Sequence, residues 1–167
     1  MSELAIAELT IDADVPIPES LTESALTSLS HHVLSAEAAE GAWTLGFRFV
    51  DDTEMQAMHL AFMGLDSPTD IMTFPNETDD AWSFGGDEDE EDVESTDRGG
   101  DIVISVDTAA AQAEDGDWGL EEELRFLVVH GLLHLLGWDD HDDDDRAAML
   151  NRQRDLIASW LASGASA

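Results

Sequence analysis

The segment that most constrains this chain of 167 residues is HGLLHLLGWDDH, at positions 130–141. An apolar pattern predicts a helix over residues 120–136, and His130 and His134 lie four positions apart within it. Side chains at that spacing project from one face of a helix, so their ring nitrogens can converge on one ion. Gly137 can adopt a left-handed conformation, end the helix and turn the chain back beneath it. We therefore expect a fold in which the end of this helix holds a metal ion.

Two further candidate ligands follow that turn. Asp140 and His141 are the next side chains that can reach the same ion, and the spacing alone does not choose between them. The chain has no Cys, which excludes a thiolate site and leaves imidazole and carboxylate as the metal-binding groups. This set of ligands suits zinc best, with nickel, copper and manganese left open.

The same motif argues against peptide hydrolysis. Zinc proteases with two helical histidines carry a Glu directly after the first one, where it acts as the general base. Here that position holds Gly131. The motif therefore predicts a metal-dependent hydrolase in which another group, or a metal-bound hydroxide alone, moves the proton.

The rest of the chain alternates between strand-like and helix-like segments. Hydrophobic periodicity, Gly and Pro breaks and helix-capping residues locate them. Strands are predicted at 4–11, 43–50, 71–74 and 101–105, and helices at 21–40, 52–63, 107–113, 120–136 and 144–161. This order predicts a single mixed α+β domain over residues 1–162, with an exposed acidic loop at about 76–99 and a frayed tail at 163–167.

The charge of the chain limits its partners. It has 39 Asp and Glu against six Arg and no Lys, a formal net charge of -33. A broad basic face for nucleic acid is therefore excluded, and any polyanion must be bound locally. A hydrophobic fraction of 43% predicts an ordinary core beneath the acidic surface. Such a surface suits either a protein that works in concentrated salt or a generally acidic protein kept soluble by its charge.

Targeting signals are not evident in the sequence. The N-terminus has no basic region before an apolar run, and no apolar stretch approaches the roughly 18 residues of a membrane span. We therefore expect a cytoplasmic protein that binds neither a membrane nor DNA.

Three motifs taken together resemble those of one known family. HGLLHLLGWDDH at 130–141, GDIVIS at 100–105 and HLAFMGLDSPTDIMTFP at 59–75 are similar to segments of the YbeY family, the bacterial metal-dependent endoribonucleases of ribosomal RNA maturation. The resemblance covers nearly the whole chain. It implies a four-stranded mixed sheet packed with helices, a zinc-protease-like histidine helix and one Zn²⁺ per chain. It also implies action on single-stranded RNA near the 3′ end of the small-subunit rRNA, in ribosome maturation and quality control.

The resemblance also implies roles for individual residues. The third histidine ligand of the family falls at Asp140, and ungapped spacing to Met149 favours Asp140, whereas the commoner use of imidazole as a ligand favours His141. Asp101 matches a family Asp close to the metal and is a candidate catalytic residue, with a strand-initial turn as the alternative. Met63 replaces a family Arg that serves the RNA or the transition state. Met can neither donate a hydrogen bond nor neutralise a phosphate.

Other polar residues have less specific predictions. Thr69, Asp70 and Thr73 match the pocket strand of the family, although hydroxyls at such positions are more often turn and ladder partners. His59 stands where the family usually has Asn, and we expect a surface or packing role for it. The positive charges nearest in sequence to the histidine helix are Arg125, Arg146, Arg152 and Arg154.

The sequence is consistent with two functions of different classes, and a third is less favoured. The first is a metal-dependent endoribonuclease specific for single strands. The second is a non-catalytic, metal-stabilised ribosome assembly factor, suggested by Met63 and by the absence of Lys. A metalloprotease comes last because of Gly131. The native metal, the cleavage position and the oligomeric state do not follow from the sequence.

The net charge of -33 predicts an unusual response to salt. Raising KCl from about 0.1 to 1 M shortens the Debye length from about 10 to 3 Å, which screens both the self-repulsion of the chain and its repulsion of phosphate. The melting temperature and any RNA affinity should therefore rise over this range, the reverse of basic RNA-binding proteins. Thermal melts and binding titrations across the series check this, and a steady fall in melting temperature would contradict it.

Overall fold

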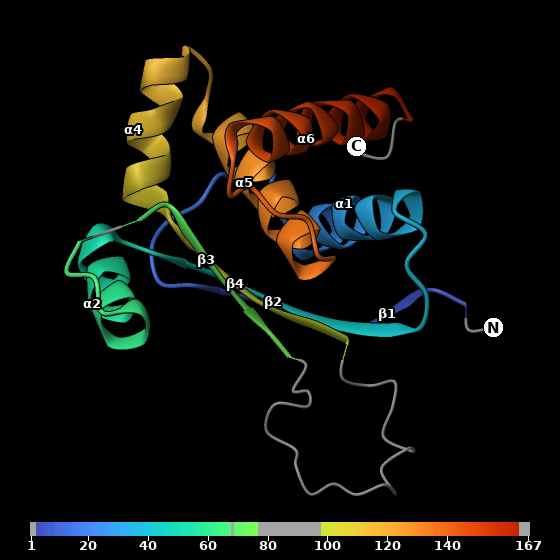
Figure 1. Cartoon of the computed structure of the whole chain (residues 1–167), viewed down its shortest axis with the longest axis horizontal. Helices are drawn as coiled ribbons and strands as arrows, with labels where there is room; N and C mark the ends of the chain where they lie inside the picture. Colours follow the sequence, from blue (N-terminus) through green and yellow to red (C-terminus); the bar gives the residue numbers. More distant parts are fainter. Residues whose placement is uncertain (1–2, 68, 77–97, 164–167) are drawn as a thin grey trace, which may run out of the picture.

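The computed structural model describes residues 3–67, 69–76 and 98–163. Most of the predicted acidic loop at 76–99 and of the predicted tail at 163–167 lies outside these ranges. Figure 1 shows a single sheet with helices packed against it. Among the helices of the described ranges, none is both long and apolar enough to cross a membrane.

Within the described ranges the sheet has four strands. They are β1 (Ala5–Ala13), β2 (Ala42–Val50), β3 (Ile71–Pro75) and β4 (Arg98–Ser105), in the spatial order β1-β2-β4-β3. β2 runs parallel to both β1 and β4, whereas β3 is antiparallel to β4 and forms one edge of the sheet. The mixed sheet confirms the predicted α+β class.

Helices lie on both faces of the sheet. In the described ranges they are α1 (Glu23–Ala36), α2 (Asp52–Met63), α4 (Val106–Gly116), α5 (Leu120–Leu135) and α6 (Asp143–Ala162). In Figure 1, α1, α5 and α6 are grouped over one face, and α2 packs against the other. The predicted histidine helix is α5, which lies between the sheet and α6.

The alternation in β2 accounts for the two packed faces. The residues predicted for its buried face all lie in the larger core, beneath α1, α5 and α6: Trp43, Leu45, Phe47 and Phe49. Val50 points to the opposite face, where it packs with Met55 of α2. Successive strand residues point to opposite faces, so one strand supplies both layers.

Two helices end at positions that differ from the prediction. α1 ends at Ala36 instead of residue 40, because Ala38 adopts a left-handed conformation with a φ of 61°. α4 continues to Gly116 instead of about residue 113, and the next residue, Asp117, has a φ of 66°. Neither left-handed residue is Gly, the residue that most often marks such a turn, so the sequence could not locate these ends.

β4 begins at Arg98, three positions before the predicted start at residue 101. Two glycines that read as loop residues are part of the ladder. Gly99 has a φ of 114°, and a Cβ there would lie 2.0 Å from the Thr44 carbonyl oxygen of β2. Only Gly fits this backbone conformation and this close approach.

The histidine helix lies unusually close to the sheet at Gly131. A Cβ at this buried position would lie 3.0 Å from two carbons of the Ile102 side chain in β4. The position that holds the general base in zinc proteases therefore faces the core here, and it has no room for a Glu. Close packing at Gly131 fixes the height of α5 above the sheet.

This packing predicts a stability effect. Gly131→Val should destabilise the fold by about 1–3 kcal/mol, because added methyl groups overfill the contact with Ile102. The loss is measured as a lower midpoint in urea unfolding. Ile102→Ala alone is also destabilising, but the double variant should be more stable than the sum of the two losses predicts, since the clash is relieved. Strict additivity would contradict the packing argument.

Candidate metal centre

Three side chains meet at the C-terminal end of α5. The Nε2 atoms of His130 and His134 lie 3.0 Å apart. Asp140 Oδ2 lies 3.6 Å from the first and 3.7 Å from the second. In the described part of the chain, this is the only group of three or more His, Cys, Asp or Glu side chains close enough together to hold one metal ion.

The hydrogen bonds behind the two rings orient them for metal binding. His130 Nδ1 lies 2.8 Å from Gln153 Oε1 of α6, and the amide nitrogen of Gln153 donates to the carbonyl of Phe126, which turns its oxygen toward the ring. His134 Nδ1 lies 3.1 Å from the carbonyl oxygen of Trp138. Both Nδ1 atoms therefore donate, which leaves the lone pairs on the two Nε2 atoms.

This arrangement fits a cation. Two imidazole lone pairs aimed at each other across 3.0 Å repel, and a cation between them and the carboxylate of Asp140 relieves that repulsion. Burial lowers the pKa of His130, an effect that its hydrogen bond with Gln153 partly opposes. The neutral imidazole that burial favours is the form that binds a metal.

The turn after α5 delivers the third group. Gly137 has a φ of 104°, and Trp138 N donates to the Leu133 carbonyl at 2.9 Å, which reverses the chain beneath the helix as predicted. The indole of Trp138 donates to Glu37 Oε1 at 3.0 Å, so the turn is attached to the end of α1. This turn brings the Asp140 side chain close to the two histidines.

The two candidates for the third ligand lie at different distances from the histidines. His141 is turned outward, with a side chain that is 84% exposed and hydrogen-bonded to Asp139. Asp140 is the residue that lies with the histidines. The ungapped spacing to Met149 therefore identified the nearer residue, whereas the preference for imidazole did not.

The three groups open into a pocket of about 370 Å³ beside the edge strand β3. Its other lining residues come from α2, from β3 and from the turn before β3: His59, Met63, Thr69, Asp70, Ile71, Met72, Thr73 and Phe74. The polar residues that matched the family's pocket strand, Thr69, Asp70 and Thr73, do line this pocket. Asp70 also accepts a hydrogen bond from Gln112 at 3.2 Å.

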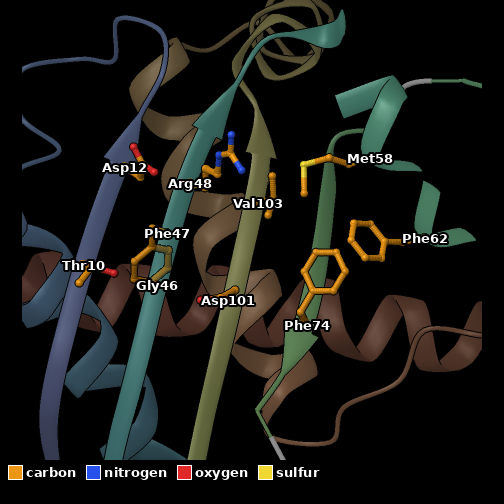
Figure 2. Close-up of a pocket in the computed structure, with 10 residues that line it drawn as sticks. All are labelled: Thr10, Asp12, Gly46, Phe47, Arg48, Met58, Phe62, Phe74, Asp101 and Val103. Atoms are coloured by element: carbon orange, nitrogen blue, oxygen red, sulfur yellow. The ribbon is translucent and has the colours of Figure 1, made fainter. Parts of the chain in front are cut away.

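Asp101 does not lie with the histidines. It lines a separate cavity of about 510 Å³ on the other face of the sheet. Figure 2 shows its carboxylate between Thr10 and Phe74, where it lies over Gly46, since a Cβ on that Gly would be 2.4 Å from Asp101 Oδ1. Ile102, the next residue, faces α5, so strand alternation directs Asp101 away from it.

The positive charges are also placed elsewhere. All six Arg lie in the described ranges, and none of them lines the histidine pocket. Arg125 pairs with Glu121 and stands over the Trp160 ring, and Arg152 pairs with Glu37 at 2.6 Å. Nearness in sequence to the histidine helix did not predict nearness to its metal-binding end.

Two residues of the site were not identified from the sequence. Gln153 supports His130 from α6, 23 positions away, and no local pattern connects the two. His59, for which a surface or packing role was expected, lines the pocket. A histidine on the helix that precedes the pocket strand was the available signal.

The geometry predicts which substitutions remove the metal. Replacing His130, His134 or Asp140 with Ala should abolish stoichiometric metal binding and lower the melting temperature of the metal-loaded protein, because bound metal stabilises the fold by linkage. His141→Ala is the matched control and should keep one equivalent. Elemental analysis after dialysis, with thermal melts, gives the answer. Loss of metal from His141→Ala with retention in Asp140→Ala would reverse the assignment.

Comparison with known proteins agrees with the motifs. A family model described as "Endoribonuclease YbeY" matches residues 10–161. An Endoribonuclease YbeY of Gloeobacter violaceus is 40% identical over 152 residues, 90% of this chain and 73% of that protein. That of Halalkalibacterium halodurans is 35% identical over 140 residues, 83% of this chain and 86% of that protein. A Thermotoga maritima protein solved in solution shares the fold, with a TM-score of 0.58 and 24% identity over 95% of both chains. The chain therefore belongs to the YbeY family of endoribonucleases.

Proposed function

We propose that this protein is a zinc-dependent endoribonuclease that cleaves single-stranded RNA during maturation of the small-subunit rRNA 3′ end, in the cytoplasm. Family membership supports the endoribonuclease activity. The observation that carries the metal dependence is the convergence of two imidazole lone pairs and one carboxylate in an open pocket.

His130, His134 and Asp140 would hold the ion. Two imidazoles and one carboxylate are ordinary ligands for catalytic zinc, a site type with three protein ligands. Zinc bound there would supply a Lewis acid next to the scissile phosphate and a water of lowered pKa. The oxygen that attacks the phosphorus is that of water or of the ribose 2′-hydroxyl.

The pocket supports a preference for single strands. A cavity of about 370 Å³ beside a sheet edge admits one unstacked nucleotide, whereas a nucleotide within a duplex must first leave the stack at a cost of a few kcal/mol. Among the described residues β3 pairs with β4 alone, and alternate residues of an edge strand direct backbone N–H groups away from their neighbour. These groups are donors for the phosphate in a pocket without Arg.

The lack of Arg in this pocket is also consistent with a second function, that of a non-catalytic assembly factor. Met63 is 60% exposed at its rim and offers no charge. A metal-stabilised ribosome assembly factor that cleaves no RNA would have the same site. Peptide hydrolysis is not supported, because Gly131 faces the core instead of the pocket.

An RNA-cleavage assay tests the proposal. The zinc-loaded protein should cut a single-stranded oligonucleotide from the rRNA 3′ region and leave its duplex form intact, with the largest rate at molar KCl. Asp140→Ala is the inactive control, because it loses the metal, and His141→Ala should cleave like the wild type. A metal-loaded protein that cuts no RNA at any salt concentration would favour the assembly factor.

Met63 provides an independent prediction. Met63→Arg would place a guanidinium at the rim of the pocket, where it can pair with the phosphate and its developing charge. Cleavage of single-stranded RNA should rise, by about 10-fold for each 1.4 kcal/mol of transition-state stabilisation. Met63→Leu keeps the apolar character of the side chain and is the matched control. Equal rates for the Arg and Leu variants would show that position 63 does not contact the reacting phosphate.

A further inference from the structure

We propose that His59 is a catalytic acid of the cleavage reaction, which gives a proton to the oxygen that leaves the phosphorus. The inference rests on the proposed function and adds a residue to its machinery. His59 lies on α2 and lines the same pocket as the three metal-binding groups.

The end of α2 is built in a way that fixes the His59 ring. The helix stops at Gly64, which has a φ of 74°, and the following residues fold back along it. Gln56 Nε2 donates to Asp66 Oδ1 at 2.8 Å and holds this turn against the helix. The carbonyl oxygen of Ser67 thereby lies 2.7 Å from His59 Nδ1.

That contact assigns the tautomer of the ring. A backbone carbonyl can only accept a hydrogen bond, so His59 Nδ1 must carry the hydrogen. Nε2 is then the nitrogen that exchanges its proton, since no protein partner within hydrogen-bond distance is observed for it in the described part of the chain. A histidine oriented through one nitrogen, with the other free, is the arrangement found in general acids and bases.

The other residues of the pocket are poorer proton donors. The nitrogens of His130 and His134 are used by the metal site. Asp70 accepts a hydrogen bond from Gln112 and acts as an acceptor. The remaining polar groups of the pocket are the carboxylate of Asp140 and the hydroxyls of Thr69 and Thr73.

Among the described residues that line this pocket, His59 is the only one besides His130 and His134 whose side chain can carry a positive charge. Imidazole changes its charge between about pH 5 and 8, which makes it an effective acid near neutrality. An imidazolium at His59 would offer the phosphate the positive charge that Met63 lacks. Proton donor and counter-charge are then supplied by one side chain.

Cleavage forms one bond to phosphorus and breaks another. An attacking oxygen, from water or the 2′-hydroxyl, forms a bond to phosphorus and loses its proton to solvent. The bond between phosphorus and the leaving ribose oxygen breaks, and that oxygen keeps the electron pair and takes the proton from His59 Nε2. Neutral His59 then regains a proton from solvent.

His59→Asn separates a chemical role from a structural one. The Asn amide can still donate to the Ser67 carbonyl from nearly the position of Nδ1, but it has no second nitrogen to deliver a proton. Cleavage at saturating RNA should fall by about 10²- to 10⁴-fold, while metal content and melting temperature match those of the wild type. His31→Gln, at an exposed position of α1, is the control and should cleave normally. Normal cleavage by His59→Asn would overturn the inference.

A modified substrate identifies the step. The ends of the wild-type products show which ribose oxygen leaves, and a second RNA then carries sulfur at that bridging position. Because a thiolate leaves without protonation, the deficit of His59→Asn should nearly disappear on this RNA if His59 is the acid. An equal deficit on both substrates would overturn that role.

The tautomer can be checked without cleavage. Nitrogen-15 NMR of the metal-free protein with labelled histidine should show His59 protonated at Nδ1 in its neutral form, and protonation at Nε2 would overturn the inference. The cleavage assays separate the proposed endoribonuclease function from the proposed role of His59. A wild type that cleaves neither RNA overturns the proposed function itself, whereas a wild type that cleaves while His59→Asn is unimpaired overturns only the role of His59.

Discussion

The site depends on the two hydrogen bonds that hold the imidazoles from behind. Gln153 and the carbonyl of Trp138 accept from the Nδ1 atoms of His130 and His134, and this fixes both rings with their lone pairs facing each other. The acceptors come from α6 and from the turn after α5. The site therefore exists only when α5, its turn and α6 are packed together, so a metal ion bound there would stabilise the tertiary structure.

The same dependence affects the third position of the site, where Asp140 lies in place of the third imidazole of the family motif. The two histidines are oriented by α6 and by the turn, so the third position needs only a donor atom at the right place. Asp140 supplies that atom from a turn anchored through Trp138 to Glu37. In a metal-loaded site, a carboxylate ligand would lower the net charge, so the ion would be a weaker Lewis acid than one held by three imidazoles. Delivery of a proton by another group in the pocket would then be more important.

Much of the fold follows from local patterns. Hydrophobic periodicity with Gly and Pro breaks predicted the four strands, the long apolar run predicted the histidine helix, and Gly137 predicted the turn after it. Non-local features were not predictable in this way. Gln153 reaches His130 only through helix packing, and Arg152 pairs with Glu37, 115 positions away. Asp101 is instructive, because the alternation of β4 around Ile102 already directs it to the other face; the motif match obscured that local signal.

Glu37 connects these observations to the ionic environment. One of its oxygens accepts from the Trp138 indole and the other pairs with Arg152 at 2.6 Å, and its side chain is only 14% exposed. Exposed pairs such as Arg48 with Asp14, at 39% and 44% exposure, weaken as ions accumulate, but a partly buried pair such as Arg152 with Glu37, at 33% and 14%, is screened less. At molar salt concentrations, the contacts of Glu37 that join the turn after α5 to α1 and α6 would therefore persist when most surface ion pairs are screened. Salt would then screen the charges on the protein surface, while the geometry around His130, His134 and Asp140 stayed constant.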